Sequence, residues 1–271
     1  MDYKQLFSDI FTLNGKSLHL RFCKLMAIIK RSLILPFKKN FGNGKDIRKI
    51  PVIINNRNRY TYLLQLINWL ENNGYSNIYI IDNNSTYPKL LEYYSSTKYT
   101  VFRLKENVGN YSLWKTDIYK QFISDYYIYT DPDVVPVDEC PGNVIEVFLG
   151  ILNSHRLIEK IGFGLKIDDL PDYFADKHKV LEWEKKFWEK PVEKDLYDAD
   201  IDTTFALYRP YSNMGIWVPK AYRTGGKFMA RHLPWYENTA SLSEENIYYQ
   251  NHVRTGISHW TPSPPVNYSN R

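Results

Sequence analysis

The sequence predicts an α/β fold with a Rossmann-like, mostly parallel central sheet flanked by helices and an N-terminal helical arm. From residue 50 onward, short apolar runs alternate with segments of helical periodicity, which is the rhythm of βαβ units. Each apolar run is followed by a polar loop, as expected where parallel strands end at a ligand-binding edge. With 271 residues and 44% hydrophobic content, the chain can form one large domain or two small ones.

Four predicted strands alternate with three predicted helices over residues 50–133. The strands lie in "IPVIINN", "NIYIIDNNS", "YTVFRLKENVGN" and "YYIYTDPD", and the helices in "YTYLLQLINWLENNGY", "YPKLLEYYSS" and "YSLWKTDIYKQF". The first helix places Leu63, Leu66 and Leu70 on one face and ends at Gly74, a C-cap signal.

The pattern continues less regularly after residue 133. We predict a helix in "DECPGNVIEVFLGIL", a strand in "KIGFGLKI", a charged helix in "KVLEWEKKFWEK" and a strand within "DADIDTTFALYRP". The segment "RTGGKFMARHLPWYENTASLSEENIYYQNHV" is predicted to cover the site and to end in a helix.

Charge divides the chain into a basic arm and an acidic body. Eleven Lys and Arg residues and three Asp residues give residues 1–49 roughly +8, which leaves roughly −3 of the total +5 for residues 50–271. An acidic body lacks the basic surface stripe of nucleic-acid-binding proteins, so nucleic acid is excluded as a partner. We predict an arm at 1–48, one domain at 49–262 and a Pro-rich extended tail at 263–271.

The arm has the pattern of a basic amphipathic helix. Leu18, Phe22, Leu25 and Ile29 recur at helical spacing, and basic residues interrupt the apolar run before it reaches the roughly 18 residues that span a bilayer. The very N-terminus also lacks the order of a signal peptide. Two interpretations stay open: residues 16–49 lie on an anionic membrane surface, or the helix packs on its own domain with a solvated basic face.

Cysteine usage indicates a reducing compartment. Cys23 and Cys140 are the two cysteines, and their separation fits no metal-binding or redox spacing. We therefore expect a cytoplasmic protein, with the arm peripheral on the inner face of the cell membrane if it binds lipid.

Two aspartates separated by one proline follow the fourth predicted strand. Asp-x-Asp occurs at 131/133, 198/200 and 200/202, and only the first follows a strongly apolar strand directly. Pro132 restricts the backbone of Asp131, which limits how the two carboxylates are presented. Hard carboxylate oxygens suit Mg²⁺ or Mn²⁺, so Asp131 and Asp133 are predicted metal ligands. A turn that opens with Asp-Pro is the alternative.

The order of these loops resembles the nucleotide-binding half of GT-A glycosyltransferases, similar to the large family 2 group. The matching segments are "IINNRNR", "IIDNNST", "KENVGN" and the Asp-x-Asp motif in "YTDPDVVP". They cover about a third of the chain. The usual Thr/Ser-Tyr-Asn opening is replaced by Asn-Asn-Arg-Asn.

This resemblance implies that residues 49–135 bind a nucleotide sugar and residues 136–262 bind the acceptor. Carried over by position, Asn55 and Arg57 line the nucleotide pocket, Asp82 contacts the base, Asn107 and Gly109 lie near the nucleotide or sugar, Asp131 reaches the ribose or sugar and the metal, and Asp133 binds the metal and diphosphate.

The C-terminal half matches family 2 more loosely. "RTGGKF" resembles its Gly-Gly-Phe, but "ARHLPWYEN" replaces the Glu-Asp pair that follows there. A His is the third protein ligand to the metal in several other GT-A families. His232 is the candidate here, and His252 is its rival. Arg231 could bind a phosphate, with Arg209 as a weaker candidate. Trp235 and Tyr236 suit a sugar-stacking wall or core packing.

An inverting transfer also needs a general base on the face of the sugar opposite the leaving group. Asp131 and Asp133 cannot serve while they hold the metal. Candidates are Asp169 with its neighbour Asp168, Glu237 and Asp202; each also suits a cap or a solvated loop charge.

The resemblance implies a metal-dependent hexosyltransferase. It would move a sugar from a nucleotide diphosphate sugar, with UDP preferred, to a saccharide or lipid-linked acceptor in bacterial surface polysaccharide synthesis, using Mn²⁺ or Mg²⁺. Two other classes remain open: a nucleotidyltransferase of similar fold, and a non-catalytic sugar-binding module. The first is disfavoured because no Gly-rich basic loop follows the first strand.

Overall fold

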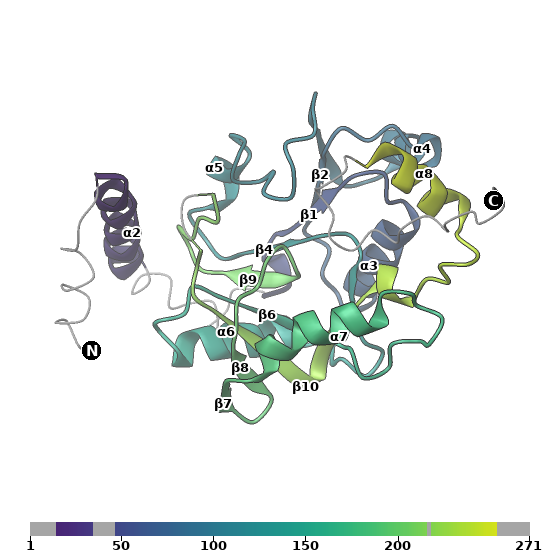
Figure 1. Ribbon diagram of the computed structural model, residues 1–271. Coiled ribbons are helices and arrows are strands. Elements are labelled where there is room, and N and C mark those ends of the chain that lie inside the picture. Colours follow the sequence, from purple (N-terminus) through teal and green to yellow (C-terminus); the bar gives the residue numbers. More distant parts are fainter. Residues whose placement is uncertain (1–14, 35–46, 216–217, 254–271) are drawn as a thin grey trace.

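A computed structural model of the chain describes residues 15–34, 47–215 and 218–253 (Figure 1). The predicted tail at 263–271 and parts of the predicted arm lie outside these ranges. The strands are β1 (Val52–Asn56), β2 (Ile78–Asp82), β3 (Thr100–Arg103), β4 (Tyr127–Thr130), β5 (Val134–Pro136), β6 (Lys160–Leu165), β7 (Pro191–Glu193), β8 (Leu196–Asp198), β9 (Ala206–Tyr208) and β10 (Ala221–His232).

All ten strands belong to one sheet, with the order β3-β2-β1-β4-β9-β6-β10-β8-β7 and with β5 paired to the end of β10. The four predicted N-terminal strands pair in parallel, so the predicted α/β fold is confirmed. Beyond β4 the sheet is mixed: β9 runs antiparallel to β4 and β6, whereas β6 and β10 are parallel. The carboxyl ends of β1, β2, β3 and β4 therefore meet at one edge.

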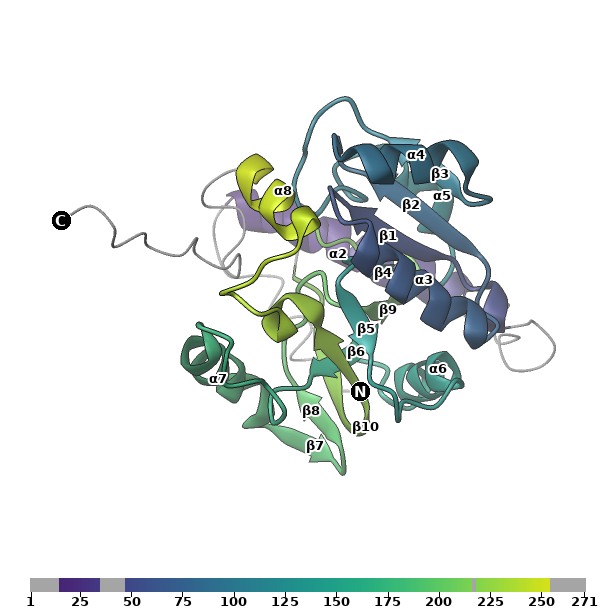
Figure 2. The ribbon, with the colours of Figure 1, turned by 90° about the vertical axis from the view of Figure 1, so that its right-hand side faces the viewer.

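The helices are α2 (Gly15–Ile34), α3 (Thr61–Asn72), α4 (Pro88–Ser96), α5 (Tyr119–Phe122), α6 (Val144–Ser154), α7 (Lys177–Lys185) and α8 (Glu244–His252). Short 3₁₀ turns cover Ile47–Lys49, Lys186–Trp188 and Leu233–Tyr236. Figure 2 shows α3 against the parallel half of the sheet and α8 beyond the ends of its strands, on the side of α4.

Two predicted elements differ from the structure. Only α5 is helical in the third predicted helix: residues 111–118 form successive turns, within which Thr116 Oγ1 donates to the Ser112 carbonyl at 2.9 Å. The Gly-Gly segment predicted to cover the site lies inside β10, where the register against β6 shifts between Thr224 and Met229. Gly226 has a φ of +59° at this irregularity, which favours glycine.

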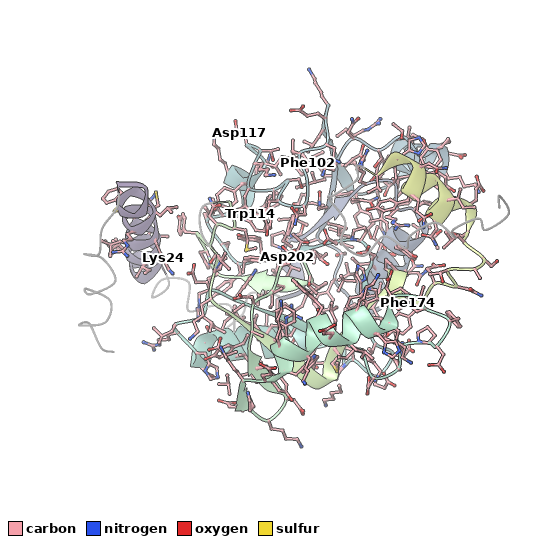
Figure 3. All side chains as sticks on the ribbon, viewed as in Figure 1. Lys24, Phe102, Trp114, Asp117, Phe174 and Asp202 are labelled. Carbon is pink, nitrogen blue, oxygen red and sulfur yellow. The ribbon has the colours of Figure 1, made fainter. Side chains whose placement is uncertain are left out.

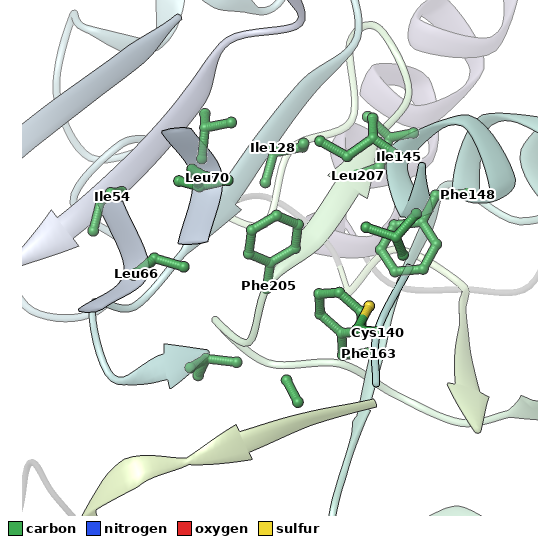
Figure 4. Close-up of a cluster of buried hydrophobic side chains, with 14 of the residues drawn as sticks. Ile54, Leu66, Leu70, Ile128, Cys140, Ile145, Phe148, Phe163, Phe205 and Leu207 are labelled. Atoms are coloured by element: carbon green, nitrogen blue, oxygen red, sulfur yellow. The ribbon is translucent and has the colours of Figure 1, made fainter. Parts of the chain in front are cut away.

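Alternate residues of the parallel strands pack on opposite faces of the sheet. Ile54 faces a large core with Leu66 of α3 and Phe148 of α6 (Figure 4). Its neighbour Ile53 faces a second core that contains Trp114. This period of two buries both faces of the sheet, so polar side chains remain mainly at the strand ends.

Helix α2 confirms the predicted helix in the arm. Lys24 lies on its side toward the body, 3.8 Å from the Glu159 carboxylate (Figure 3). Phe22 and Leu33 are 60% and 65% exposed. Across the described ranges, no helix combines the length and the apolar composition needed to cross a membrane.

Candidate functional site

A pocket of about 450 Å³ lies at the edge of the sheet where the parallel strands end. Residues from all four predicted polar loops line it, and they include Asn55, Arg57, Asn83, Asn107, Gly109, Asp131 and Asp133. The prediction that the four loops converge is therefore confirmed. Their convergence follows from the parallel pairing, which brings the carboxyl end of each strand to the same edge.

Side-chain amides hold the loops together. Asn83 donates from Nδ2 to the Gly109 carbonyl at 2.8 Å and accepts from the Val108 amide at 2.8 Å. Gly109 has a φ of +88°, a conformation that a side chain would strain. Asn58 likewise accepts from the backbone amides of Thr86 and Tyr87. These bonds link the loops after β1, β2 and β3, which form the floor of the pocket.

Asp82 lies just behind this floor. It is almost fully buried and is not among the described lining residues. Its carboxylate accepts from the Ser85 amide at 3.1 Å and pairs with Arg103 at 3.3 Å. Asp82 thus orders the loop after β2, and its predicted contact with a base stays a prediction.

Asp131 and Asp133 stand directly beyond the carboxyl end of β4. The Asp131 amide donates to the Thr203 carbonyl at 3.0 Å, and the Thr203 hydroxyl donates to the Asp131 carboxylate. Burial, and next the negative charge of Asp133, raise the pKa of Asp131 well above its ordinary value. The two carboxylates are therefore costly to ionise together, and a bound cation would offset that cost.

His232 reaches this pair through the sheet. Strand β5 begins one residue after Asp133 and runs antiparallel to the end of β10, with His232 opposite Val134. This register places His232 Nε2 3.6 Å from Asp133 Oδ2. Burial lowers the pKa of His232, so its neutral imidazole, the form that binds metals, is favoured. Its Nδ1 atom is buried without a hydrogen-bond partner in the structure.

These side chains suit a divalent cation whose coordination shell is completed by the substrate. Two carboxylates and one neutral imidazole are ligands that Mn²⁺ accepts, and Mg²⁺ binds through one or two carboxylates plus phosphate oxygens. In the described part of the chain, no group of three or more His, Cys, Asp or Glu side chains is arranged to hold a metal ion by itself. Among the described lining residues, five carboxylates face three guanidinium groups, an excess that also favours a divalent cation.

Only one of the predicted general bases lines the pocket. Asp202 does, and it accepts from the Tyr111 hydroxyl at 2.9 Å. Figure 3 labels Asp202 near the middle of the molecule. Asp169 and Glu237 are outside the described lining. Asp169 pairs with Arg231 at 2.8 Å, and Glu237 accepts from Tyr62 at 2.7 Å.

The predicted phosphate-binding arginines also lie elsewhere. Arg231 is outside the described lining and is paired with Asp169 and Asp138. Arg209 is buried and donates to the carbonyls of Leu152 and Ile158, so it is a structural residue. Arg231 is left with two carboxylate partners and no contact with the described pocket.

Of the two predicted aromatic residues and the rival histidine, Trp235 lines the described pocket and the other two do not. Trp235 is buried and lines the pocket beside the His232 ring, with the ring centroids 4.8 Å apart, whereas Tyr236 is outside the described lining. His252 is exposed and outside the described lining, and it stacks on Tyr248, with ring centroids 4.0 Å apart.

The wall opposite the four loops contains residues that the sequence did not single out as site residues. Trp183 at the end of α7 is 50% exposed and lines the pocket with Phe187. Behind them Arg223 pairs with Glu184 at 2.9 Å and donates to the Asp200 carbonyl at 2.7 Å. The sequence shows only a charged helix and a distant Arg. The contact between Arg223 and Glu184 depends on how β8 and β10 pair, which the sequence does not reveal.

Comparisons with known proteins find structural likeness but no sequence relative. No family model matches the chain, and a search of curated proteins finds no match. Among 47 matching chains of solved structures is a crystal structure of S. aureus TarS 1-349, with 16% identity over 59% of this chain and 47% of that one, and a TM-score of 0.38. A second S. aureus TarS structure has 15% identity over 59% of this chain and 28% of that one, with a TM-score of 0.37.

A third match is a crystal structure of GalNAc-T7 with UDP, GalNAc and Mn²⁺. It has 14% identity over 64% of this chain and 42% of that one, with a TM-score of 0.40. The chain thus spans less than half the length of these solved structures. At these values the likeness concerns part of the fold, and the proposal below depends on the chain's own site residues.

Proposed function

We propose that this chain is a metal-dependent glycosyltransferase of hexosyltransferase type. It would transfer a sugar from a nucleotide diphosphate sugar, with UDP preferred, to a saccharide or lipid-linked acceptor in bacterial surface polysaccharide synthesis. The observation that carries the proposal is the pair Asp131 and Asp133, joined by His232, at the edge where four polar loops meet.

The donor would occupy the side of the pocket made by the parallel strands. Asn55, Arg57, Asn107 and Gly109 line that side and offer amide, guanidinium and backbone groups to a nucleotide. The network through Asn83 keeps this surface fixed before binding, which lowers the entropy lost on association.

Asp131, Asp133 and His232 would hold Mn²⁺ or Mg²⁺. Bound there, a divalent ion supplies Lewis-acid stabilisation of the negative charge on the leaving diphosphate. The Thr203 hydroxyl orients the Asp131 carboxylate through its hydrogen bond. Burial of His232 keeps its ring neutral and able to bind the ion.

Asp202 is the candidate that fits a general base best. It lines the pocket from the connection between β8 and β9. Asp169 and Glu237 lie outside the described lining and are held by other partners. The hydrogen bond from Tyr111 fixes the orientation of its carboxylate. Trp183 and Phe187 on the same wall offer aromatic surface to an acceptor sugar.

A thermal-shift panel with UDP, GDP and TDP, each with and without Mn²⁺, tests the proposal. We expect one nucleotide to stabilise the wild-type chain more strongly when Mn²⁺ is present, because ligand binding to the native state raises its stability. Asp133→Asn should remove the metal-dependent part of that shift. Absence of any metal-dependent shift with all three nucleotides would count against the proposal, and release of labelled sugar would separate a transferase from a binding module.

We also propose an anionic membrane surface as the partner of residues 16–49. The described part of α2 exposes Phe22, Ile29 and Leu33 together with Lys30, the combination that binds anionic lipid interfaces. Sedimentation with phosphatidylglycerol vesicles but not with phosphatidylcholine vesicles would support this partner. Phe22→Ser with Lys30→Glu should abolish the difference; equal sedimentation with both lipids would argue against it.

A further inference from the structure

Arg59 is a buried cation in the wall of the pocket. It follows β1 and is only 5% exposed, yet it is among the lining residues. Its Nη1 atom donates to Asn246 Oδ1, and its guanidinium carbon lies 3.5 Å from the centre of the Tyr249 ring. The sequence contains it in "NNRNR", but no pattern distinguishes it there from its neighbour Arg57.

The charge of Arg59 is not neutralised within the described chain. In residues 15–34, 47–215 and 218–253, no carboxylate forms an ion pair with it, and its Nε atom is buried without a hydrogen-bond partner. The other buried guanidinium of the pocket, that of Arg223, has Glu184 at 2.9 Å. A buried charge without a counterion is costly, so the site is incomplete without an anion.

Arg59 lines the same pocket as the predicted metal ligands Asp131, Asp133 and His232. Tyr249, whose ring lies against the Arg59 guanidinium, lines this pocket too. The unpaired guanidinium and the aspartate pair therefore face one cavity.

We propose that Arg59 binds a phosphate group of the donor diphosphate, and that helix α8 holds its guanidinium in place for this contact. The proposal rests on the proposed function and adds a phosphate-binding residue and its positioning element. A guanidinium offers a planar set of donors that matches phosphate oxygens, and that of Arg59 lines the pocket with no carboxylate partner among the described residues.

Helix α8 is anchored where it can position Arg59. Its Glu245 carboxylate accepts from the amides of Tyr60 and Thr61 at 3.1 and 2.9 Å, next to Arg59 in the chain. Asn246 and Tyr249, one and four residues further on, contact Arg59 itself. Glu245, which binds the start of α3, and Asn246, which binds Arg59, are thus successive residues of α8. Helix α8 and the loop after β1 therefore move together.

Inorganic pyrophosphate, titrated calorimetrically in the presence of Mg²⁺, is the direct probe. We expect wild-type protein to bind it and Arg59→Gln to bind it about 10- to 100-fold more weakly, because charge-assisted hydrogen bonds are lost. Arg156→Gln removes an exposed arginine elsewhere and should bind like the wild type. Unchanged affinity in Arg59→Gln, or a loss that follows Arg231→Gln in its place, would overturn the proposal.

Asn246→Asp tests the same point in a variant that should remain folded. The new carboxylate gives Arg59 the partner that it lacks, so we expect a higher melting temperature and about tenfold weaker pyrophosphate binding. In an Arg59→Gln background the same change should have little further effect on affinity. Equal losses in both backgrounds would mean that the added charge acts without Arg59, and the positioning role of α8 would be wrong.

Nucleoside diphosphates separate this proposal from the proposed function. If pyrophosphate binding depends on Arg59 but UDP, GDP and TDP bind no more tightly than pyrophosphate, the glycosyltransferase proposal fails and the phosphate site stands. If one nucleoside diphosphate binds wild type and Arg59→Gln equally in the presence of Mn²⁺, the role of Arg59 fails and the donor site stands.

Discussion

His232 Nε2 lies 3.6 Å from Asp133 Oδ2, although the two residues belong to opposite halves of the chain. The short antiparallel ladder between β5 and β10 causes this, because it sets His232 opposite Val134. The Leu233 amide also donates to the Asp133 carbonyl at 2.8 Å, which locks the register. The C-terminal half of the chain therefore places an imidazole nitrogen directly beside the aspartate pair.

Replacement of His232 by Asn should weaken metal binding. Loss of one ligand should lower Mn²⁺ affinity by about tenfold or more, and calorimetric titration of Mn²⁺ in the presence of the preferred nucleoside diphosphate measures it. His178→Asn, which changes an exposed histidine outside the described lining, is the matched control. Equal Mn²⁺ affinity in wild type and His232→Asn would exclude His232 as a ligand.

Asp131→Asn should stabilise the metal-free chain. The folded-state pKa of Asp131 is raised, first by burial and then by Asp133, so folding becomes less favourable as the pH rises above the ordinary range near 4. An amide removes that repulsion and can still accept from Thr203. We expect a rise of about 2–4 °C in melting temperature at pH 7 with EDTA, equivalent to about 1 kcal/mol.

The same variant should lose the increase in melting temperature that Mn²⁺ and nucleotide give to the wild type. A metal-free Asp131→Asn protein that melts below the wild type at pH 7 would contradict the electrostatic explanation. Scans at pH 4 provide the control, since the difference between the two proteins should shrink as the pH falls to the ordinary value near 4, where Asp131 is protonated in the folded state and half protonated in the unfolded state.

Lys160→Met should change how stability depends on pH. Lys160 is fully buried beneath the Asp202 loop, where Nζ donates to the Ile201 carbonyl, and burial lowers its pKa to about 7. Between about pH 7 and the unfolded-state value near 10.4, the unfolded chain binds more protons, so wild-type stability gains up to about 1 kcal/mol per pH unit from this group.

Denaturant unfolding at pH 7, 8 and 9 measures the effect. The difference in unfolding free energy, Lys160→Met minus wild type, should fall as the pH rises, since the wild type loses its buried charge. Lys190→Met changes an exposed lysine and should give a difference that does not vary with pH. A constant difference for Lys160→Met would mean that Lys160 titrates normally.

Asp202→Asn should impair transfer more than substitution of the other two candidate bases. General-base catalysis contributes about 10²- to 10⁴-fold, so we expect a decrease in kcat of that size with nucleotide binding retained. Asp169→Asn should mainly loosen Arg231, and Glu237→Gln should mainly disturb Tyr62. A larger loss of kcat in either of these than in Asp202→Asn would assign the base elsewhere.

The parallel half of the sheet and the polar edge of the pocket could be predicted from the amino-acid sequence. Apolar periodicity is local, so the strands that end at residues 56, 82, 103 and 130 could be predicted along with the loops after them. Parallel pairing then made convergence of Asn55, Asn107 and Asp131 a consequence of topology.

Tertiary structure alone decided which distant residues meet those loops. The register of β5 on β10 brought His232 to Asp133, and the docking of α8 buried Arg59 without a counterion. The same packing pairs Arg231 with Asp169 outside the described lining. Local sequence specifies where a strand ends, but strand register and helix docking depend on the fit of the whole core, which no short window of residues contains.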